Sequence, residues 1–342
     1  MGDLYLRFDG YDDLKAILSE SDENVLRRLG RPALICIPGS DRVPRARVVS
    51  CLLHGNEDSG YRAVLEMLRA GARFPFDLWV FIGNVRAASH EGWFAHRFLD
   101  DQEDFNRVWG LAAPTTRMRR CADAVLDELR GTDLEAAVDL HNNTGQNPFY
   151  TVVPRPGYET LTLAATCADT ALLWGLRAHT LMEELSPRCP AVAIECSLPA
   201  RRTSTLFAAS ALERFLAART FDDERRPRHL FEMRFRVTVR PEVPFAFGGT
   251  LTDDLDLILT PGLDGYNFGM LLAGTELGRI HPGAAVPLEV TGMAGEDATD
   301  RFLTARADGR VVVTEDVTPA MMVTTVVQTR RDCLFYIVRR RS

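Results

Sequence analysis

The 342-residue sequence predicts an α/β protein with a mixed, mostly parallel sheet flanked by helices and an appended C-terminal all-β domain. Two observations predict this fold. Short apolar, β-branched segments alternate with helical patterns up to about residue 225, and strand patterns punctuated by Gly and Pro follow. The charged segment 222–229 is the expected linker between domains 1–229 and 230–342.

Apolar segments that could be buried on both faces predict the strands of the first domain. They are ALICI (33–37), ARVVSCLLH (46–54), DLWVFIGN (77–84), LEAAVDLH (134–141) and PAVAIEC (190–196). Segments with helical periodicity lie between and after these predicted strands, at 59–72, 115–131, 158–174 and 203–221. This alternation predicts helices on both faces of the sheet.

The C-terminal part has almost no helical period. Its strand-like segments are 228–245, 277–292, 304–317 and 320–340, each bounded or interrupted by turn residues. They predict an all-β domain.

Composition and charge narrow the classes of partner. A net charge of −7 spread over both signs, with only Arg339–Arg341 as a basic block, argues against nucleic acid or an acidic membrane surface. No apolar run reaches the roughly 18 residues of a membrane span, and the N-terminal residues lack a hydrophobic signal core. The seven scattered cysteines form no CxxC pair and predict reduced core thiols. We therefore expect a cytoplasmic protein, with homo-oligomerisation left open.

The stretch LLHGNEDSG (52–60) places His54 and Glu57 just after an apolar strand. The carboxyl end of a strand in an α/β sheet is where ligand sites usually form. Taken alone, the pair has a simpler interpretation, in which Glu57 caps the helix that starts near Ser59 and His54 is an ordinary loop histidine.

A third residue favours a metal site. In VDLHNNTG a predicted strand again ends in a histidine, His141. Two histidines with one carboxylate are a ligand set of catalytic zinc. We expect one zinc per chain, bound by His54, Glu57 and His141. Asp139 lies on the same side of its strand as His141, so it could orient an imidazole or simply make a strand-end hydrogen bond.

Taken in order, HGNE (54–57), RFLDDQEDFNR (97–107), DLHNNTG (139–145) and AIE (193–195) resemble the succinylglutamate desuccinylase/aspartoacylase family of the zinc carboxypeptidase clan. The resemblance implies a zinc carboxypeptidase-like fold and the zinc ligands His54, Glu57 and His141. It also implies roles for four further residues: Arg97 polarises the scissile carbonyl, Asn106 and Arg107 hold a substrate carboxylate, and Glu195 is the general base.

Each of these roles has a simpler alternative. Arg97 and Arg107 lie in an acidic stretch and could be surface ion-pair partners, and Asn106 could only shape a turn. Glu195 is harder to explain structurally, because an ionisable residue after five apolar ones is seldom buried without a function.

The sequence also departs from the family pattern. Phe105 stands where the second motif usually has leucine, which is a tolerable apolar change. Aspartoacylases place an arginine upstream of the late strand to bind a side-chain carboxylate, whereas this chain has Glu183, Glu184 and Leu185 near that point. Arg188 is the closest cation and is the expected replacement. The acidic pair argues against an N-acyl-aspartate and favours a substrate with an amino or guanidinium group.

Two aromatic residues follow the third motif. Phe149 and Tyr150 could line the substrate pocket, and Tyr150 is included among the candidate substrate-binding residues. A buried strand start is the alternative for both.

These observations predict a zinc-dependent amidohydrolase that removes an acyl group from a small carboxylate-bearing N-acyl amine or amino acid. A zinc carboxypeptidase for short peptides and a non-catalytic metal-binding module are the alternatives. The C-terminal domain would narrow the site entrance in the first case. The sequence has no GxSxG, Walker or dinucleotide-binding motif, which argues against those enzyme classes.

Overall fold

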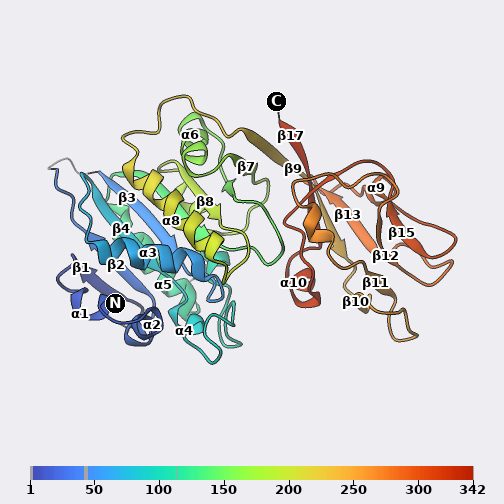
Figure 1. The fold of residues 1–342 in the computed structure, drawn as a ribbon, viewed down its shortest axis with the longest axis horizontal. Helices are drawn as coiled ribbons and strands as arrows, with labels where there is room; N and C mark the ends of the chain where they lie inside the picture. The colour runs from blue at the N-terminus through green and yellow to red at the C-terminus, as the bar shows by residue number, and fades with distance from the viewer. Residues whose placement is uncertain (1–2, 42–44, 114, 342) are drawn as a thin grey trace. The chain divides into compact units, whose positions relative to one another are not determined.

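The computed structural model describes residues 3–41, 45–113 and 115–341, which divide into two compact units (Figure 1). The first unit comprises Met1–Asn142 and Phe149–His229, and the second comprises Asn143–Pro148 and Leu230–Ser342. The short segment 143–148 therefore groups with the C-terminal residues, although it follows a strand of the first unit. No feature of the sequence predicts this exchange.

The sheet of the first unit has the strand order β1-β2-β4-β3-β5-β8-β6-β7. Its strands are β1 (Leu6–Asp9), β2 (Ala33–Ile37), β3 (Ala46–Cys51), β4 (Asp77–Ile82), β5 (Leu134–His141), β6 (Tyr150–Val153), β7 (Thr170–Leu173) and β8 (Ala191–Glu195). Neighbouring strands are parallel except for β2 with β4 and β6 with β8. The mixed, mostly parallel sheet predicted from the sequence is confirmed.

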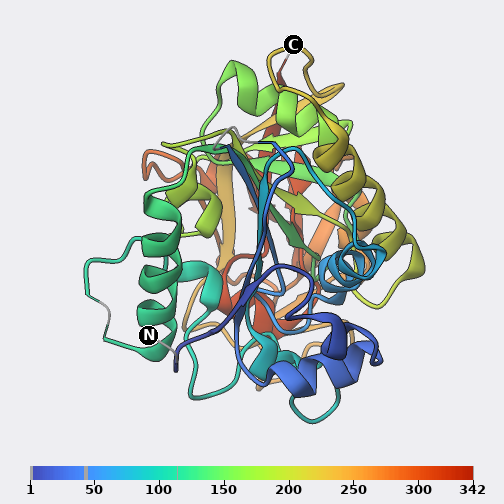
Figure 2. The same ribbon diagram turned by 90° about the vertical axis from the view of Figure 1, so that its left-hand side faces the viewer.

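Helices cover both faces of this sheet. They are α1 (Lys15–Leu18), α2 (Asp22–Leu29), α3 (Asp58–Ala70), α4 (Val85–Ala88), α5 (Arg117–Arg130), α6 (Tyr158–Cys167), α7 (Leu181–Leu185) and α8 (Arg202–Ala217). Figure 2 shows α3 and α8 on one face and α5 on the other. The two faces follow from strand alternation: Leu140 of β5 lies against Gly60 of α3, whereas Ala137 packs in the core cluster with α5.

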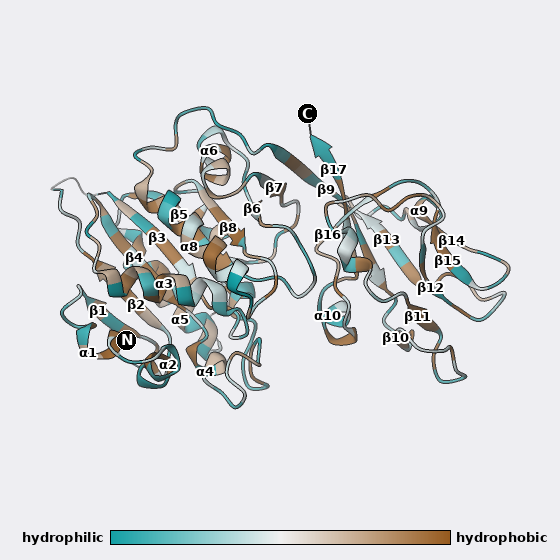
Figure 3. Ribbon diagram, in the orientation of Figure 1, coloured by the Kyte–Doolittle hydropathy of each residue, from teal (hydrophilic) through white to brown (hydrophobic). Residues whose placement is uncertain are grey.

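The amphipathic pattern of the helices explains how they pack. Hydrophobic and hydrophilic residues alternate along α3 and α8 (Figure 3), with buried residues such as Val64 and Leu68 in α3 and Leu212 and Phe215 in α8. None of the helices in the described part of the chain is long and apolar enough to cross a bilayer.

The expected helix at 158–174 is wrong beyond Cys167. Residues Thr170–Leu173 form strand β7, which pairs in parallel with β6. A short apolar run such as TALL fits a buried strand as well as a helix, and pairing with β6 decides between them.

The second unit has two groups of strands. One comprises β16-β17-β9 with β13 paired to β9, and the other has the order β10-β11-β12-β15-β14. The strands are β9 (His229–Val239), β10 (Phe245–Phe247), β11 (Leu257–Leu259), β12 (Glu276–Arg279), β13 (Leu288–Gly292), β14 (Leu303–Ala305), β15 (Arg310–Val313), β16 (Thr318–Ala320) and β17 (Phe335–Arg341). A core that includes Leu257, Val290 and Phe335 joins them. The predicted C-terminal strand domain is confirmed.

Two short helices interrupt these strands, α9 (Thr299–Phe302) and α10 (Val326–Arg331). The predicted strand pattern at 320–340 is therefore wrong at 326–331. Thr325 explains the helix, because its side chain caps the first turn by accepting a hydrogen bond from the Gln328 N–H.

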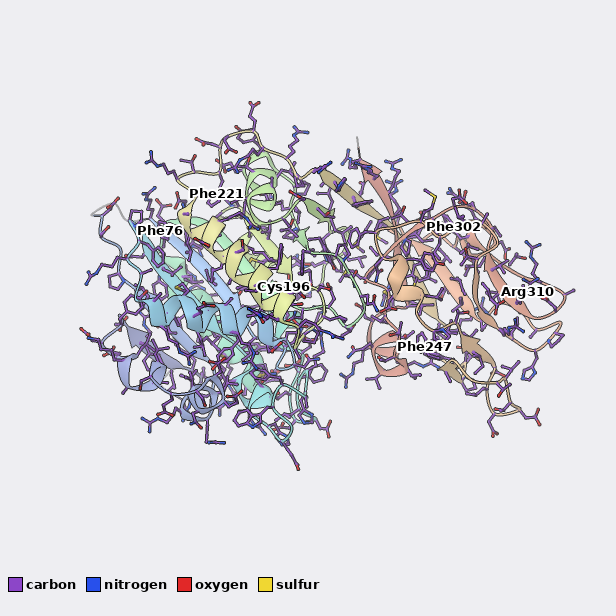
Figure 4. All side chains as sticks on the ribbon, viewed as in Figure 1. Phe76, Cys196, Phe221, Phe247, Phe302 and Arg310 are labelled. Carbon is purple, nitrogen blue, oxygen red and sulfur yellow. The ribbon has the colours of Figure 1, made fainter. Side chains whose placement is uncertain are left out.

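A buried arginine ties α8 to the sheet of the first unit. The Arg47 side chain on β3 is 1% exposed, donates from Nε to Glu135 (2.8 Å) and from its terminal nitrogens to the carbonyls of Phe215 and Ala218. Its guanidinium also stacks over Phe76 and Phe221, both labelled in Figure 4. These contacts compensate for the removal of the charge from water.

Arg47→Ala should destabilise the protein by about 3 to 5 kcal/mol, because it leaves Glu135 and two carbonyls without their buried donor. Arg45→Ala is the matched control: its side chain is 33% exposed and reaches the same Glu135 at 3.4 Å. The control should cost less than about 1 kcal/mol. Chemical denaturation measures both, and equal losses would contradict the assignment of Arg47 as the tie.

Candidate metal centre and active site

Three adjacent parallel strands, β3, β5 and β8, bring the predicted catalytic residues to one edge of the sheet. His54 follows β3, His141 ends β5 and Glu195 ends β8. In the register, Glu195 lies opposite His141 on one side and opposite Tyr150 of β6 on the other. Residues paired in this way project to the same face of the sheet, so these side chains form one row.

The two histidines and Glu57 meet in the buried interior of this edge. Nδ1 of His54 lies 2.7 Å from Glu57 Oε1, and Nδ1 of His141 lies 2.7 Å from Glu57 Oε2. One ligand atom from each residue lies within 4.8 Å of the others. All three residues are buried.

The other nitrogen of each imidazole faces a carboxylate. His141 Nε2 lies 2.5 Å from Asp139, and His54 Nε2 lies 3.0 Å from Asp104. A carboxylate at Nε2 fixes the proton there and leaves the Nδ1 lone pair directed inward. Two inward nitrogens and a carboxylate oxygen form a donor set that suits Zn²⁺, so the residues fit the predicted metal.

Asp104 is a site residue that sequence reasoning missed. It lies in the acidic run DDQED, where nothing distinguishes it from its solvent-exposed neighbours. Its place directly before the Phe-Asn-Arg end of the second motif is the one signal that could have identified it.

Burial and neighbouring charges set the ionisation of the carboxyl groups. Burial alone would raise the pKa of Glu57, but the charges of His54 and His141 and their hydrogen bonds hold it well below its usual range. Burial would likewise raise the pKa of Asp104, but the charges of His54 and Arg97 lower it by more, so it lies well below its usual range. Burial raises the pKa of Glu195 to about 7. Glu57 and Asp104 are therefore ionised at neutral pH, whereas Glu195 can exchange a proton there.

Arg97 lies beside the predicted ligands. It donates to Asp104 through Nε (3.0 Å) and to Glu57 through a terminal nitrogen (3.3 Å), and its other terminal nitrogen lies 2.6 Å from His54 Nε2. The Gly55 N–H donates to the Arg97 carbonyl (2.8 Å) and joins the two motif loops. A Cβ at Gly55 would lie 2.6 Å from Ala87 Cβ, which explains the glycine of HGNE.

Asn106 and Arg107 lie next to this group. The Asn106 amide nitrogen lies 3.1 Å from His141 Nε2, and the Asn106 side-chain oxygen accepts a hydrogen bond from the Leu181 N–H (3.1 Å). Asn106 thus supports a predicted ligand and is more than a turn residue. Arg107 is partly exposed and its guanidinium helps to lower the pKa of Asp104, which places its charge near the centre.

Arg188 lies away from the site, so its assignment to substrate binding is wrong. Its guanidinium donates to the carbonyls of Leu129 (2.7 Å) and Thr132 (2.9 Å), near the amino end of β5. His141 is at the opposite end of that strand. The physical reason is that Arg188 precedes β8, whose full length separates it from Glu195.

The acidic pair also has structural partners. Glu183 forms a capping box with Thr180 at the start of α7, and it accepts from the Ala178 N–H (3.0 Å). The Glu184 carboxylate lies where a side chain at Gly110 would be. These contacts remove the basis for expecting an amino or guanidinium group on the substrate.

The two aromatic residues differ in environment. Tyr150 is the fully buried first residue of β6 and lies beside Glu195 in the register, and its role in substrate binding stays a prediction. Phe149 stacks on Phe207 of α8 with ring centroids 4.1 Å apart.

Comparisons with known proteins agree with this geometry. Residues 45–183 match the family model of the Succinylglutamate desuccinylase/Aspartoacylase catalytic domain. No curated protein matches the chain.

Solved structures share the fold at low sequence identity. A succinylglutamate desuccinylase/aspartoacylase from Rhodobacter sphaeroides is 13% identical, with a TM-score of 0.60 over 90% of this chain and 89% of that one. The succinylglutamate desuccinylase from Chromobacterium violaceum is 18% identical, with a TM-score of 0.53 over 82% of this chain and 88% of that one. Murine aminoacylase 3 is 17% identical, with a TM-score of 0.53 over 88% of this chain and 97% of that one.

The TM-scores show that the chain shares its fold with these proteins. The family model identifies residues 45–183 as similar to a catalytic domain. Residues 45–183 therefore match the catalytic domain of the succinylglutamate desuccinylase/aspartoacylase family, the family that the order of the motifs predicted.

Proposed function

We propose that the protein is a zinc-dependent amidohydrolase that removes the acyl group from a small N-acyl amine or amino acid bearing a carboxylate. The observation that carries the proposal is the convergence of His54, Glu57 and His141. Glu195, at the carboxyl end of β8, lies next to His141 in the strand register. The match of residues 45–183 to the catalytic domain of a family of amide-hydrolysing deacylases supports a hydrolase acting on C–N bonds.

His54 and His141 would hold zinc through Nδ1, and Glu57 through its carboxylate. When bound, zinc supplies a Lewis acid and lowers the pKa of water toward roughly 7. Asp104 and Asp139 would orient the imidazoles by accepting their Nε2 protons.

Glu195 is the proton carrier in this proposal. With a pKa raised to about 7 by burial, its carboxylate can accept a proton from the attacking water at neutral pH. The same carboxyl can then donate that proton to the leaving amine. Its burial matches the function, because the carboxylate of a solvated glutamate would be a much weaker base near pH 7.

The two arginines have separate tasks. Arg97, held by Asp104 and Glu57, would stabilise the negative charge that develops on the carbonyl oxygen. Arg107 is partly exposed and can bind a substrate carboxylate through two parallel hydrogen bonds.

The substrate is proposed to bear one carboxylate on its amine part. Leu185, near the position where aspartoacylases have a second arginine, is buried in the core, and Arg188 lies near the amino end of β5. Neither residue can pair with a side-chain carboxylate, which argues against an N-acyl-aspartate.

The direct test is hydrolysis by the zinc-loaded protein of a panel of N-acyl amino acids and short peptides. We expect N-acyl amino acids without an acidic side chain to be cleaved best. Preferential cleavage of peptides would favour the carboxypeptidase alternative, and no cleavage of any panel member with zinc bound would favour the non-catalytic module.

His141→Ala should lose stoichiometric zinc, because it removes one of three protein ligands. His281→Ala changes a histidine of the second unit and should keep one zinc per chain. Elemental analysis of both purified variants gives the answer. Full zinc occupancy in His141→Ala would show that the ligand assignment is wrong.

Glu195→Gln should keep the fold and the zinc but lose on the order of 10² to 10⁴ in kcat, since the amide cannot accept the proton. Steady-state kinetics on the best panel substrate, with zinc content measured in parallel, checks this. A variant with near-normal kcat would rule out Glu195 as the general base.

Arg97→Ala should mainly lower kcat, and Arg107→Ala should mainly raise KM, since the first acts on the transition state and the second on the bound substrate. Arg188→Ala is the control and should change neither parameter. Thermal melts accompany the kinetics. Equal losses of Tm with unchanged kinetics in the folded fraction would show that both arginines have a purely structural role.

A further inference from the structure

Asn142, the residue directly after the predicted ligand His141, contacts the loops of three motifs. Its residue exposure is 4%. Its backbone N–H donates to Glu57 Oε2 (3.1 Å), and its side-chain oxygen accepts from the Ser59 N–H (3.1 Å). It therefore bonds both to a predicted ligand and to the helix that follows it.

Helix α3 needs this acceptor. The N-cap of α3 is Glu57, whose side chain makes no capping hydrogen bond because its oxygens face the two imidazoles. The first N–H groups of a helix have no acceptor within the helix. Asn142 supplies one for Ser59 from the end of β5, so the position of this strand fixes the start of α3.

The amide nitrogen of Asn142 reaches the loop that follows the general base. Nδ2 donates to the Ser197 carbonyl and to Ser59 Oγ, both at 3.0 Å, and lies 3.4 Å from the Cys196 carbonyl. Ser197 has φ +61°, a left-handed conformation that is uncommon for residues other than glycine. Such a conformation persists when surrounding contacts hold it.

A second contact joins the same two segments. The Ala200 N–H donates to Asp58 Oδ1 (2.8 Å), and Ala200 also has a positive φ, +56°. The loop after Glu195 is thus held at two points against the start of α3. Of these two contacts, only the one made by Asn142 comes from the residue next to His141.

We propose that Asn142 is a positioning residue that fixes the Glu195 loop relative to Glu57 and His141. Its side chain has no role in the chemical step, and it acts by holding the proton carrier at a fixed distance from the metal ligands. The proposal deepens the proposed function and rests on it for its kinetic consequence, whereas its structural consequence can be measured independently.

Asn147 provides a matched control. It is also a buried asparagine, 8% exposed, and its side chain also makes two backbone hydrogen bonds, to Gly145 (3.1 Å) and from Met321 (3.2 Å). All of these partners belong to the second unit. Asn147→Ala should therefore lower stability without altering the alignment of Glu195.

The experiment compares Asn142→Ala with Asn147→Ala in the zinc-loaded full chain. Misplacing a catalytic group by about 1 Å can cost on the order of 10²-fold in rate. We expect Asn142→Ala to lose roughly 10- to 100-fold in kcat with little change in KM. Asn147→Ala should keep the kcat of the unmodified chain. Both should retain one zinc.

Amide hydrogen exchange is the readout that needs no substrate. Exchange at Cys196 and Ala200, whose N–H groups bond to the His141 carbonyl and to Asp58, should be faster in Asn142→Ala and unchanged in Asn147→Ala. Asn142→Asp is a second variant in case the alanine variant fails to fold. It keeps an acceptor for Ser59 but loses the donor to Ser197, so exchange should quicken in the 196–201 loop and not at the start of α3.

The outcomes separate the two proposals. Unchanged exchange in the 196–201 loop, or a kcat of Asn142→Ala equal to that of Asn147→Ala, would overturn the positioning role. If the unmodified protein hydrolyses nothing while the loop loosens as expected, the positioning role stands and the proposed activity falls.

Discussion

The buried carboxylate of Glu57 is the group on which the rest of the site depends. One of its oxygens faces His54 and Arg97, and the other faces His141 and the Asn142 N–H. Burial disfavours its charge, and the surrounding donors more than compensate, so it stays ionised. These donors come from three segments, the loop after β3, the loop that carries Arg97 and the end of β5, and the carboxylate therefore fixes these segments against one another.

The sheet makes this convergence possible. Because β3, β5 and β8 are neighbours and parallel, the segments after them all leave at one edge. Helix α3 must begin immediately after Glu57, and the close approach of Gly60 to Leu140 lets it pack directly on β5. The candidate site is therefore built on strands and a helix, with the predicted catalytic groups at their ends.

The same buried environment acts on the carboxyl groups in opposite directions. Glu57 and Asp104 have cationic or hydrogen-bonding partners that hold their pKa values low, whereas burial dominates for Glu195 and raises its pKa to about 7. This division suits the predicted metal ligands and their supports, which must remain charged, and the predicted proton carrier, which must change its charge.

The sequence by itself determined the strand-helix alternation, the strand-rich C-terminal unit and the candidate ligands His54, Glu57 and His141. Those features depend on local patterns: apolar runs that end in polar residues, and the order of short motifs. The metal role of the ligands and the function of Glu195 remain predictions. Only the tertiary structure decided that 170–173 is a strand, that Asp104 faces His54 and that Arg188 lies away from the site. The physical reason is that each of these outcomes depends on a partner far away in the chain: β6 for the strand, an imidazole for Asp104 and the end of α5 for Arg188. The grouping of 143–148 with the second unit has the same origin, because Gln146 and Asn147 bond to Asp264 and Met321, which no local pattern connects to them.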